Sequence, residues 1–542
     1  MDISFIKSLS LETIMILLVA IVFFAVAFAL LLSSRLNALL KIAGFSLIQF
    51  AIYVSFYYLL QYNHTIHLLV GVPSALLGFL LFYFVSPETG KKGKKDPNWG
   101  VDIPLAKGGN LTLDNIRRGV IIFGSAGSGK TESCFVPIIK HAGERNFPAL
   151  CYDYKSGELT EIANFFYQNS PIKKYTIVPH NPAISDRVNP FAPRYITSEQ
   201  HLRQQTKLIF SNLKRADGQQ KGGGHNFFDK IPESTLAAVI WRLMVDYPDY
   251  CTLPHAVAFC LRKDPTEIAE FIKKNEYSRA IGTPLIDSLT SENQIAGVKA
   301  SLSLPLTDLA VPPIFYVLGG DEVDLDINNP EHPAFLSVIN EPSLEKVNAP
   351  FISVIVSTTI NQMQIRNRPP SLLLFDEGTT FSIDNISRIP ATMRSYNIAT
   401  IFSTQDKALA KENYGDVITN SLLANLSYQI IGKINDPESV KYYKQLSEEI
   451  EKKTTSTSFK GGLINSDTRY SESLRETSKF KNQDFTRLKP GQFFVFADGN
   501  ENLYNLKLIP YTRIESKVKH HVTKEELNRN FTKIFDEAFA LD

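Results

Sequence analysis

Three long apolar runs dominate the first part of the chain. They cover roughly residues 13–34, 42–60 and 66–85, and the first contains no charged side chain. Each is close to the ~20 residues that an apolar helix needs to cross ~30 Å of hydrocarbon. A secretory signal peptide would instead have a shorter apolar core followed by a small-residue cleavage site. We therefore interpret residues 1–95 as a transmembrane anchor with three candidate spans.

The basic residues beside these runs predict how the runs are arranged. Arg35 and Lys41 flank the first connection, residues 61–67 contain no Lys or Arg, and the basic stretch Lys91–Lys95 follows the third run. Basic connections stay on the cytoplasmic side, so three spans with the N-terminus outside satisfy all three connections. Two spans with one re-entrant or interfacial segment are the alternative. Either arrangement leaves the bulk of the chain in the cytoplasm.

Past residue 95, short apolar runs rich in β-branched residues alternate with helical patterns. This alternation predicts an α/β fold in which a mostly parallel sheet is covered by helices on both faces. We assign this sheet domain to residues 96–197 and 309–515. The expected strands are Val120–Phe123, Ala149–Asp153, Tyr175–Val178, Ile314–Leu318, Leu372–Phe375, Ala399–Phe402, Gln429–Ile431 and Phe493–Phe496.

A helical stretch separates the two parts of the sheet domain. Residues 198–308 have the pattern of consecutive helices, among them "STLAAVIWRLMVDY" and "PTEIAEFIKKN", and contain no convincing strand. Helical periodicity sustained over this length is typical of an all-helical unit. We interpret residues 198–308 as an all-helical domain inserted into the sheet domain.

Two segments near the C-terminus have their own patterns. Residues 452–482 are polar and rich in Ser, Thr and Lys, which favours a mobile surface loop. Residues 516–542 are expected to form a C-terminal helix with one apolar face. Packing into the core is the expected role of this face, and docking of a partner is the alternative. The apolar positions are Leu527, Phe531, Ile534, Phe535 and Ala538.

Composition adds two limits to this organisation. The formal net charge of the 542 residues is +2, so no overall field identifies a nucleic-acid or membrane partner. The four cysteines form no CxxC pair, which argues against a zinc site and fits reduced thiols in a cytoplasmic body. They are Cys134, Cys151, Cys251 and Cys260.

The stretch "GSAGSGKTE" follows the expected strand Val120–Phe123 and precedes a helical segment. It fits the G-x-x-x-x-G-K-[ST] spacing of a phosphate-binding loop (P-loop). In such a loop backbone N–H groups surround phosphate oxygens, the lysine reaches the β- and γ-phosphates, and the threonine binds Mg²⁺. The sequence therefore predicts ATP and Mg²⁺ as cofactors, with Thr131 as a metal ligand. The cofactor-binding residues are Gly124, Ser125, Ala126, Gly127, Ser128, Gly129, Lys130, Thr131 and Glu132.

Two further strand ends supply catalytic candidates. Asp376 and Glu377 directly follow the apolar run Leu372–Phe375. Asp376 is expected to hold Mg²⁺ through water, and Glu377 to polarise the attacking water as general base. Gln405 ends the next apolar run, where its amide can contact the γ-phosphate. A strand between the two nucleotide motifs is typical of the RecA-like branch of P-loop ATPases.

Together these motifs resemble one family, the type IV coupling proteins, which are TraD/TraG-like membrane ATPases of conjugation and type IV secretion related to FtsK–HerA motors. The motifs that carry the resemblance are "GSAGSGKTES", "YDYKSGELT", "RVNPF", "NFFDKIPESTLAA", "LLLFDE" and "FSTQ", and it covers nearly the whole chain. The resemblance implies a RecA-like P-loop ATPase domain with an inserted all-helical domain, preceded by transmembrane helices in the bacterial inner membrane. Two features depart from the family. The loops between the candidate spans are short, and the chain stops soon after its last expected strand, which puts substrate recognition by a tail in doubt.

The resemblance also implies a homohexamer with ATP at the subunit boundaries. In such a ring an arginine from the neighbouring subunit neutralises charge on the transferred phosphoryl group. The family places this residue between the Asp-Glu strand and the strand that ends in Gln. Arg394 occupies that position, and Arg388 is the alternative.

The implied function is that of an ATP-hydrolysing coupling protein. It would recruit and pump single-stranded DNA, with attached relaxase, to a type IV secretion channel in conjugation, using other type IV secretion components and the membrane as partners. The alternative is a receptor or docking ATPase that delivers protein effectors to a type IV secretion system without DNA translocation. A membrane scaffold that binds ATP without hydrolysing it is disfavoured by intact Lys130, Asp376, Glu377 and Gln405.

Overall fold

A computed structural model of the chain describes residues 11–33, 38–54, 66–85, 95–216, 227–289, 291–447, 449–460, 467–497 and 500–542. These residues form two compact units, Met1–Lys94 and Lys95–Asp542, and each is described by itself.

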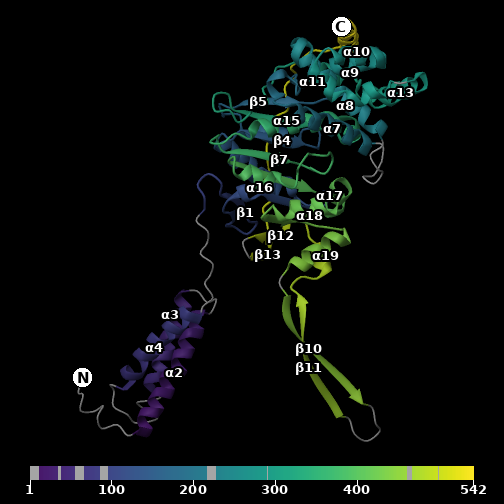
Figure 1. Cartoon of the computed structure of the whole chain (residues 1–542). Helices are drawn as coiled ribbons and strands as arrows, with labels where there is room; N and C mark the ends of the chain where they lie inside the picture. Colours follow the sequence, from purple (N-terminus) through teal and green to yellow (C-terminus); the bar gives the residue numbers. More distant parts are fainter. Residues whose placement is uncertain are drawn as a thin grey trace. The chain divides into compact units, whose positions relative to one another are not determined.

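The first unit contains three helices, drawn in purple in Figure 1. They are α2 (Leu11–Ser33), α3 (Ala38–Val54) and α4 (Ile66–Val85), and they coincide with the three apolar runs. Each helix contributes a buried side chain to one small apolar cluster, formed by Phe28, Ile52 and Val70. The three helices therefore pack against one another.

No single helix among the described residues is both long enough and apolar enough to cross a membrane. The shorter apolar helices are Leu18–Phe28, Gly44–Val54 and Val70–Phe79. Gln294–Leu309 and Pro312–Leu318, which meet at a 78° bend, have sufficient length and apolarity only as a pair. The predicted orientation depends on segments that lie outside the described residues, including Arg35, residues 61–65 and Lys91–Lys94.

The second unit is built on a nine-stranded sheet in the order β13-β12-β9-β3-β8-β7-β4-β6-β5. The seven strands from β9 to β5 pair in parallel, while β12 runs antiparallel to β9 and β13 antiparallel to β12. The expected mostly parallel sheet is confirmed. Its strands are β3 (Val120–Phe123), β4 (Ala149–Asp153), β5 (Lys173–Ile177), β6 (Ala334–Ile339), β7 (Ser371–Phe375), β8 (Ile398–Thr404), β9 (Tyr428–Ile431), β12 (Gln492–Ala497) and β13 (Asn500–Asn505).

Both faces of this sheet are covered, as the continuous apolar runs require. In β3, Ile121 and Phe123 belong to one buried cluster, and Val120 and Ile122 belong to the other. The side chains of β4 alternate in the same way. The covering helices include α5 (Val136–Glu144), α6 (Glu158–Phe166), α15 (Glu345–Met363), α16 (Ile389–Arg394), α17 (Lys407–Tyr414), α18 (Asp416–Ala424) and α19 (Pro437–Leu446).

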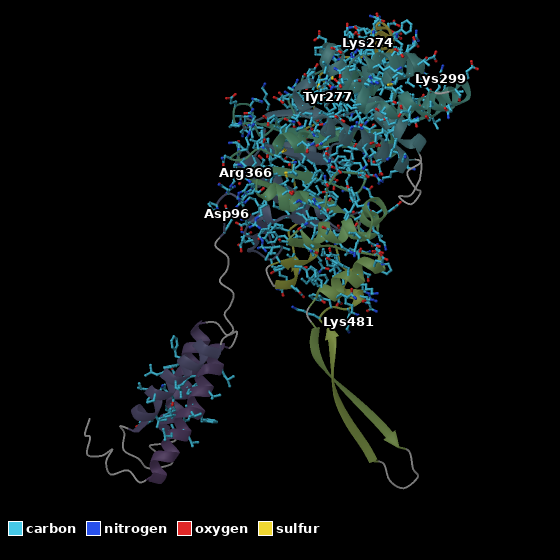
Figure 2. The ribbon with its side chains drawn as sticks, viewed as in Figure 1. Asp96, Lys274, Tyr277, Lys299, Arg366 and Lys481 are labelled. Atoms are coloured by element: carbon cyan, nitrogen blue, oxygen red, sulfur yellow. The ribbon has the colours of Figure 1, made fainter. Side chains whose placement is uncertain are left out.

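Between β5 and β6 the described residues form helices and no strand (Figure 1). Figure 2 shows Lys274, Tyr277 and Lys299 on the outer surface of these helices. The helical region belongs to the same compact unit as the sheet, because one buried cluster runs through both. Its main helices are α7 (Glu199–Ala216), α8 (Phe227–Asp246), α9 (Leu253–Arg262), α10 (Pro265–Lys273), α11 (Glu276–Ile281), α12 (Thr283–Ser288), α13 (Glu292–Leu309) and α14 (Pro312–Leu318).

One expected strand is wrong. Ile314–Leu318 lies in helix α14, which begins with the Pro312–Pro313 pair. Proline favours the first turn of a helix, and a short apolar run by itself does not distinguish a buried strand from a buried helix. The strand that the sequence analysis missed is β6, which is buried along its whole length. Consequently the helical region continues to residue 318, past its expected end at residue 308.

The polar segment 452–482 also differs from the expected loop. Most of it lies in two antiparallel strands, β10 (Glu449–Lys460) and β11 (Asp467–Ser478), which pair from Glu449↔Ser478 to Lys460↔Asp467 (Figure 1). The two strands form a ribbon without a continuous apolar face. The polar composition of the segment therefore gave no sign of strands. Other short elements include the hairpin of β1 (Val101–Pro104) and β2 (Asn110–Leu113), and the helix α20 (Asn482–Thr486).

The C-terminal helix α21 (Lys524–Phe539) packs on the helical region. The ring of Phe531 lies 5.0 Å from that of Phe315 in α14, and the ring of Phe535 lies 6.2 Å from it. The apolar face therefore has a packing role. The chain between β13 and α21 is extended and runs past the loop that follows β3.

Candidate nucleotide-binding site

The P-loop leaves the sheet at the carboxyl end of β3, between β8 and β9. Backbone hydrogen bonds fasten it to both neighbours: the N–H of Gly124 donates to the carbonyl of Thr404 (3.3 Å), and the N–H of Ser125 donates to that of Lys433 (2.9 Å). Gly129 has a φ of +88°, and an ideal Cβ there would lie 2.7 Å from Cδ2 of Leu508. This position therefore requires glycine.

The chain after the loop continues directly into helix. Residues Thr131–Phe135 form a π-helical turn that leads into α5. The buried hydroxyl of Ser128 has no hydrogen-bond partner among the described residues. A positive helix end, a glycine-bearing loop and a spare hydroxyl donor together fit a phosphate group.

Lys130 lies inside this loop and is almost fully buried. Its Nζ donates to the carbonyl of Gly124 and to Oε1 of Glu377, each at 2.7 Å. The second contact crosses from the P-loop to the end of β7, two strands away in the sheet. The structure thus brings together the lysine and the acid that sequence spacing predicted separately.

The acid pair sits at the carboxyl end of β7 and is buried. The hydroxyl of Ser403 in β8 donates to Oδ1 of Asp376 (3.0 Å) and accepts from the backbone N–H of Glu377 (3.2 Å). Glu377 has a φ of +49°, a left-handed conformation that a residue other than glycine rarely adopts. Ser403, which the sequence analysis did not single out, therefore helps to fix both acids.

Burial is the largest influence on the pKa of two carboxyl groups at this edge of the sheet, Glu377 and Asp153. Burial raises the pKa of Glu377, the ammonium of Lys130 opposes that shift, and the nearby Asp376 adds to it. A second carboxyl group, Asp153, ends the adjacent strand β4, and burial raises its pKa to about 6 despite hydrogen bonds from Thr160. Buried carboxyl groups with raised pKa values therefore lie at this edge of the sheet, and a raised pKa suits a carboxylate that accepts a proton during hydrolysis.

Thr131, the predicted metal ligand, faces a second acidic group. Its Oγ1 lies 3.5 Å from Oε2 of Glu158, in the "YDYKSGELT" stretch. Glu158 also accepts from the hydroxyl of Tyr511 (2.8 Å) and from Nη2 of Arg513 (2.9 Å). Tyr511 and Arg513 lie in the extended chain before α21, and no local sequence signal marked them.

The fit to Mg²⁺ rests on few protein ligands. No group of three or more His, Cys, Asp or Glu side chains in the described part of the chain could hold a metal alone. Mg²⁺ beside a nucleotide normally uses one or two protein ligands together with phosphate oxygens and water. Thr131 and Asp376, at the edge where the P-loop and β7 end, are compatible with that mode.

Gln405 and the arginine candidates lie outside the buried cluster. Gln405 directly follows β8, at the strand end where the sequence analysis placed it. Its side chain is exposed, and its contacts do not define a role. Arg394 is also exposed and ends α16, before the first residue of β8. Since β8 has seven residues, about 20 Å of strand separates Arg394 from the P-loop of its own subunit.

Comparisons with known proteins agree on the fold. The family model described as "TraM recognition site of TraD and TraG" matches residues 370–490. The conjugative coupling protein TrwBdeltaN70 in its unbound form is similar with a TM-score of 0.59 and 13% identity, over 79% of this chain and 92% of that one. TrwB in complex with ADP and Mg²⁺ has a TM-score of 0.59 and 12% identity, over 80% and 93%.

These matches confirm the resemblance to the type IV coupling proteins. A more distant similarity extends to VirB4 of Thermoanaerobacter pseudethanolicus, with a TM-score of 0.51 and 13% identity, over 78% of this chain and 99% of that one. No curated protein matches the sequence. The fold of the coupling protein TrwB is therefore shared across most of this chain.

Proposed function

We propose that this chain is an ATP-hydrolysing coupling protein that moves single-stranded DNA, with attached relaxase, to a type IV secretion channel. The observation that carries the proposal is the buried contact between Lys130 and Glu377, at the strand ends where a P-loop and an acid pair meet. The resemblance to TrwB, which was solved with ADP and Mg²⁺, supports ATP and Mg²⁺ as the cofactors here.

The site residues have separate tasks in hydrolysis. The loop N–H groups and Lys130 bind the triphosphate, and Glu377 accepts a proton from the water that attacks the γ-phosphorus, giving ADP and phosphate. Mg²⁺, when bound by Thr131 and Asp376, would neutralise phosphate charge. The ammonium of Lys130 cannot keep its short contact with Glu377 and also bind the phosphates closely. When ATP binds, the ammonium therefore moves toward the phosphates, and the carboxylate of Glu377 loses its partner. Base activation then depends on ATP binding.

Arg394 is proposed to act on a neighbouring subunit in a homohexamer. The length of β8 keeps it from its own P-loop, so any catalytic contact must be made across a subunit boundary. Gln405, exposed beside the P-loop strand, is proposed to contact the γ-phosphate. The three N-terminal helices are proposed to anchor the protein in the bacterial inner membrane, with the ATPase body in the cytoplasm.

The membrane proposal has its own test. Reporter fusions at residues 61–67 should give a periplasmic signal, and fusions at Lys91–Lys95 a cytoplasmic one. A cytoplasmic signal at residues 61–67 would contradict three spans. Loss of membrane association after deletion of residues 1–95 would support the anchor, and retention would count against it.

Docking of protein effectors without DNA movement is the second candidate. It is favoured by the near-neutral net charge, and by the match of residues 370–490 to a model named for recognition of a partner protein. The decisive assay measures ATP hydrolysis by the purified full-length chain with single-stranded DNA at increasing salt. The coupling function predicts stimulation that falls steeply with salt, because phosphate contacts release counterions. A rate of ATP hydrolysis that does not change with DNA but increases with a co-purified protein would favour the effector receptor.

A further inference from the structure

The loop after the acid pair is held by residues of the inserted helical region. Residues 378–382 directly follow Glu377. In helix α7, the guanidinium of Arg215 donates through Nη1 to the carbonyl of Thr380 and through Nη2 to that of Thr379 (3.0 Å). Arg215 thus binds two successive carbonyl groups with one rigid fork.

Asn212, one turn earlier in α7, holds the far end of the same loop. Its Oδ1 accepts from the N–H of Ser382 (2.8 Å), and its Nδ2 donates to the Ser382 carbonyl (3.3 Å). Asn212 is only 1% exposed. These paired bonds couple the loop to α7. On its other side the loop is held by α17, where Asn413 and Tyr414 donate to carbonyl groups of residues 378–381.

The loop in turn fixes Glu377. The N–H and the hydroxyl of Thr380 both donate to the backbone carbonyl of Glu377, at 3.0 and 2.8 Å. Only one hydrogen-bonded step therefore separates the residue held by Arg215 from the backbone of Glu377. Because Glu377 has a left-handed backbone conformation, it depends on such contacts to keep its side chain in place.

We propose that Arg215 and Asn212 are positioning residues through which helix α7 of the helical region sets the placement of Glu377, and hence the rate of ATP hydrolysis. This inference rests on the proposed ATPase function. It makes the helical region a regulator of the hydrolytic step: whatever displaces α7 changes turnover without touching the P-loop.

A purely structural role is the competing explanation, because Arg215 also lies 3.7 Å from Glu345, whose carboxylate accepts from the hydroxyl of Tyr154 (2.9 Å). The two explanations differ in which kinetic constant changes. A misplaced base lowers kcat and leaves ATP binding intact, whereas general destabilisation lowers the folded fraction and affects both.

The test uses the purified full-length chain and measures kcat, KM for ATP and nucleotide affinity. Arg215→Ala should lower kcat about 10- to 100-fold while KM and affinity stay within about twofold. Arg215→Lys should recover part of kcat, since an ammonium can reach one carbonyl but cannot imitate the fork. Arg203→Ala is the matched control, because Arg203 lies in α7 and pairs only with Glu199 among the described residues.

The outcomes separate this inference from the function on which it rests. Absence of ATP hydrolysis in the unmodified chain would contradict the proposed function itself. An active chain in which Arg215→Ala keeps its kcat, or changes only KM, would overturn the positioning role alone. If Arg215→Ala does not fold, Arg215→Lys decides: it keeps the charge beside Glu345, so an unchanged kcat overturns the role and a lowered kcat with unchanged affinity supports it.

Discussion

The ammonium nitrogen of Lys130 lies 2.7 Å from Oε1 of Glu377, and both side chains are only 4% exposed. A buried ion pair is compatible with a stable fold, whereas removing one partner leaves an uncompensated buried charge, which is strongly destabilising. The stability of the fold, as well as ATP hydrolysis, should therefore depend on both the phosphate-binding lysine and the proposed base.

Removing the lysine should destabilise the fold in addition to abolishing ATP turnover. Lys130→Ala leaves Glu377 buried without its partner, which costs about 3 kcal/mol or more. Combining it with Glu377→Gln should restore part of that loss, because the isolated charge is then gone. Denaturant unfolding of the wild-type chain, both single variants and the double variant measures this coupling. Additive effects would contradict a stabilising pair.

The pH dependence of Lys130→Ala should have a defined sign. Without the ammonium, burial and Asp376 both raise the pKa of Glu377 above its unfolded value. A carboxyl group with a raised folded-state pKa favours folding most below its unfolded pKa, and that advantage is lost as pH rises through the folded pKa. The difference in the free energy of unfolding between wild type and Lys130→Ala should therefore become smaller as the pH falls. A difference in unfolding free energy that stays constant from pH 4 to pH 8 would contradict this prediction.

Gly378→Ala should impair hydrolysis although it removes no functional group. A Cβ at Gly378 would lie 2.3 Å from Cε2 of Phe402, a fully buried ring in β8. The residue after Glu377 must then shift, and misplacement of about 1 Å can cost about 10²-fold in rate. Gly297→Ala in helix α13 is the control, because a Cβ there meets nothing within 4 Å. Equal kcat for both variants would argue against a constrained Glu377.

Arg394→Ala should bind ATP nearly normally yet lose most hydrolysis, on the order of 10³-fold for an arginine supplied from a neighbour. Mixing Arg394→Ala with Lys130→Ala subunits should restore some activity, because some boundaries then pair an intact P-loop with an intact arginine. Failure to restore activity despite demonstrated co-assembly would move the assignment to Arg388 or remove the arginine from the mechanism.

The sequence predicted those parts of the site that lie within short motifs. The P-loop, Asp376 and Glu377 each follow an apolar strand, and parallel strands bring their carboxyl ends to one edge of the sheet. The contacts of Ser403, Glu158 and Arg215 were not predicted. Ser403 and Glu158 lie within the quoted stretches "FSTQ" and "YDYKSGELT", but the contacts of all three residues join segments distant in sequence, and no spacing rule encodes them. Arg394 was placed by family resemblance, and the structure adds only that its own P-loop is out of reach.

The errors in the fold have local physical causes. Ile314–Leu318 and β6 are both short apolar runs, and only the Pro312–Pro313 pair before the first distinguishes its helix from a strand. The β10–β11 ribbon was missed because alternating Ser, Thr and charged residues carry no apolar signal. Long apolar strands and sustained helical periodicity were predicted correctly since burial on both faces, or on one face, leaves a clear pattern.

The most direct test of the account is the fate of ATP on Glu377→Gln. This substitution keeps the shape of the side chain and a carbonyl oxygen for Lys130, but it removes the base. The account predicts that purified Glu377→Gln binds ATP with affinity close to that of wild type and retains it unhydrolysed in single-turnover experiments. Wild-type turnover by Glu377→Gln would contradict Glu377 as the general base.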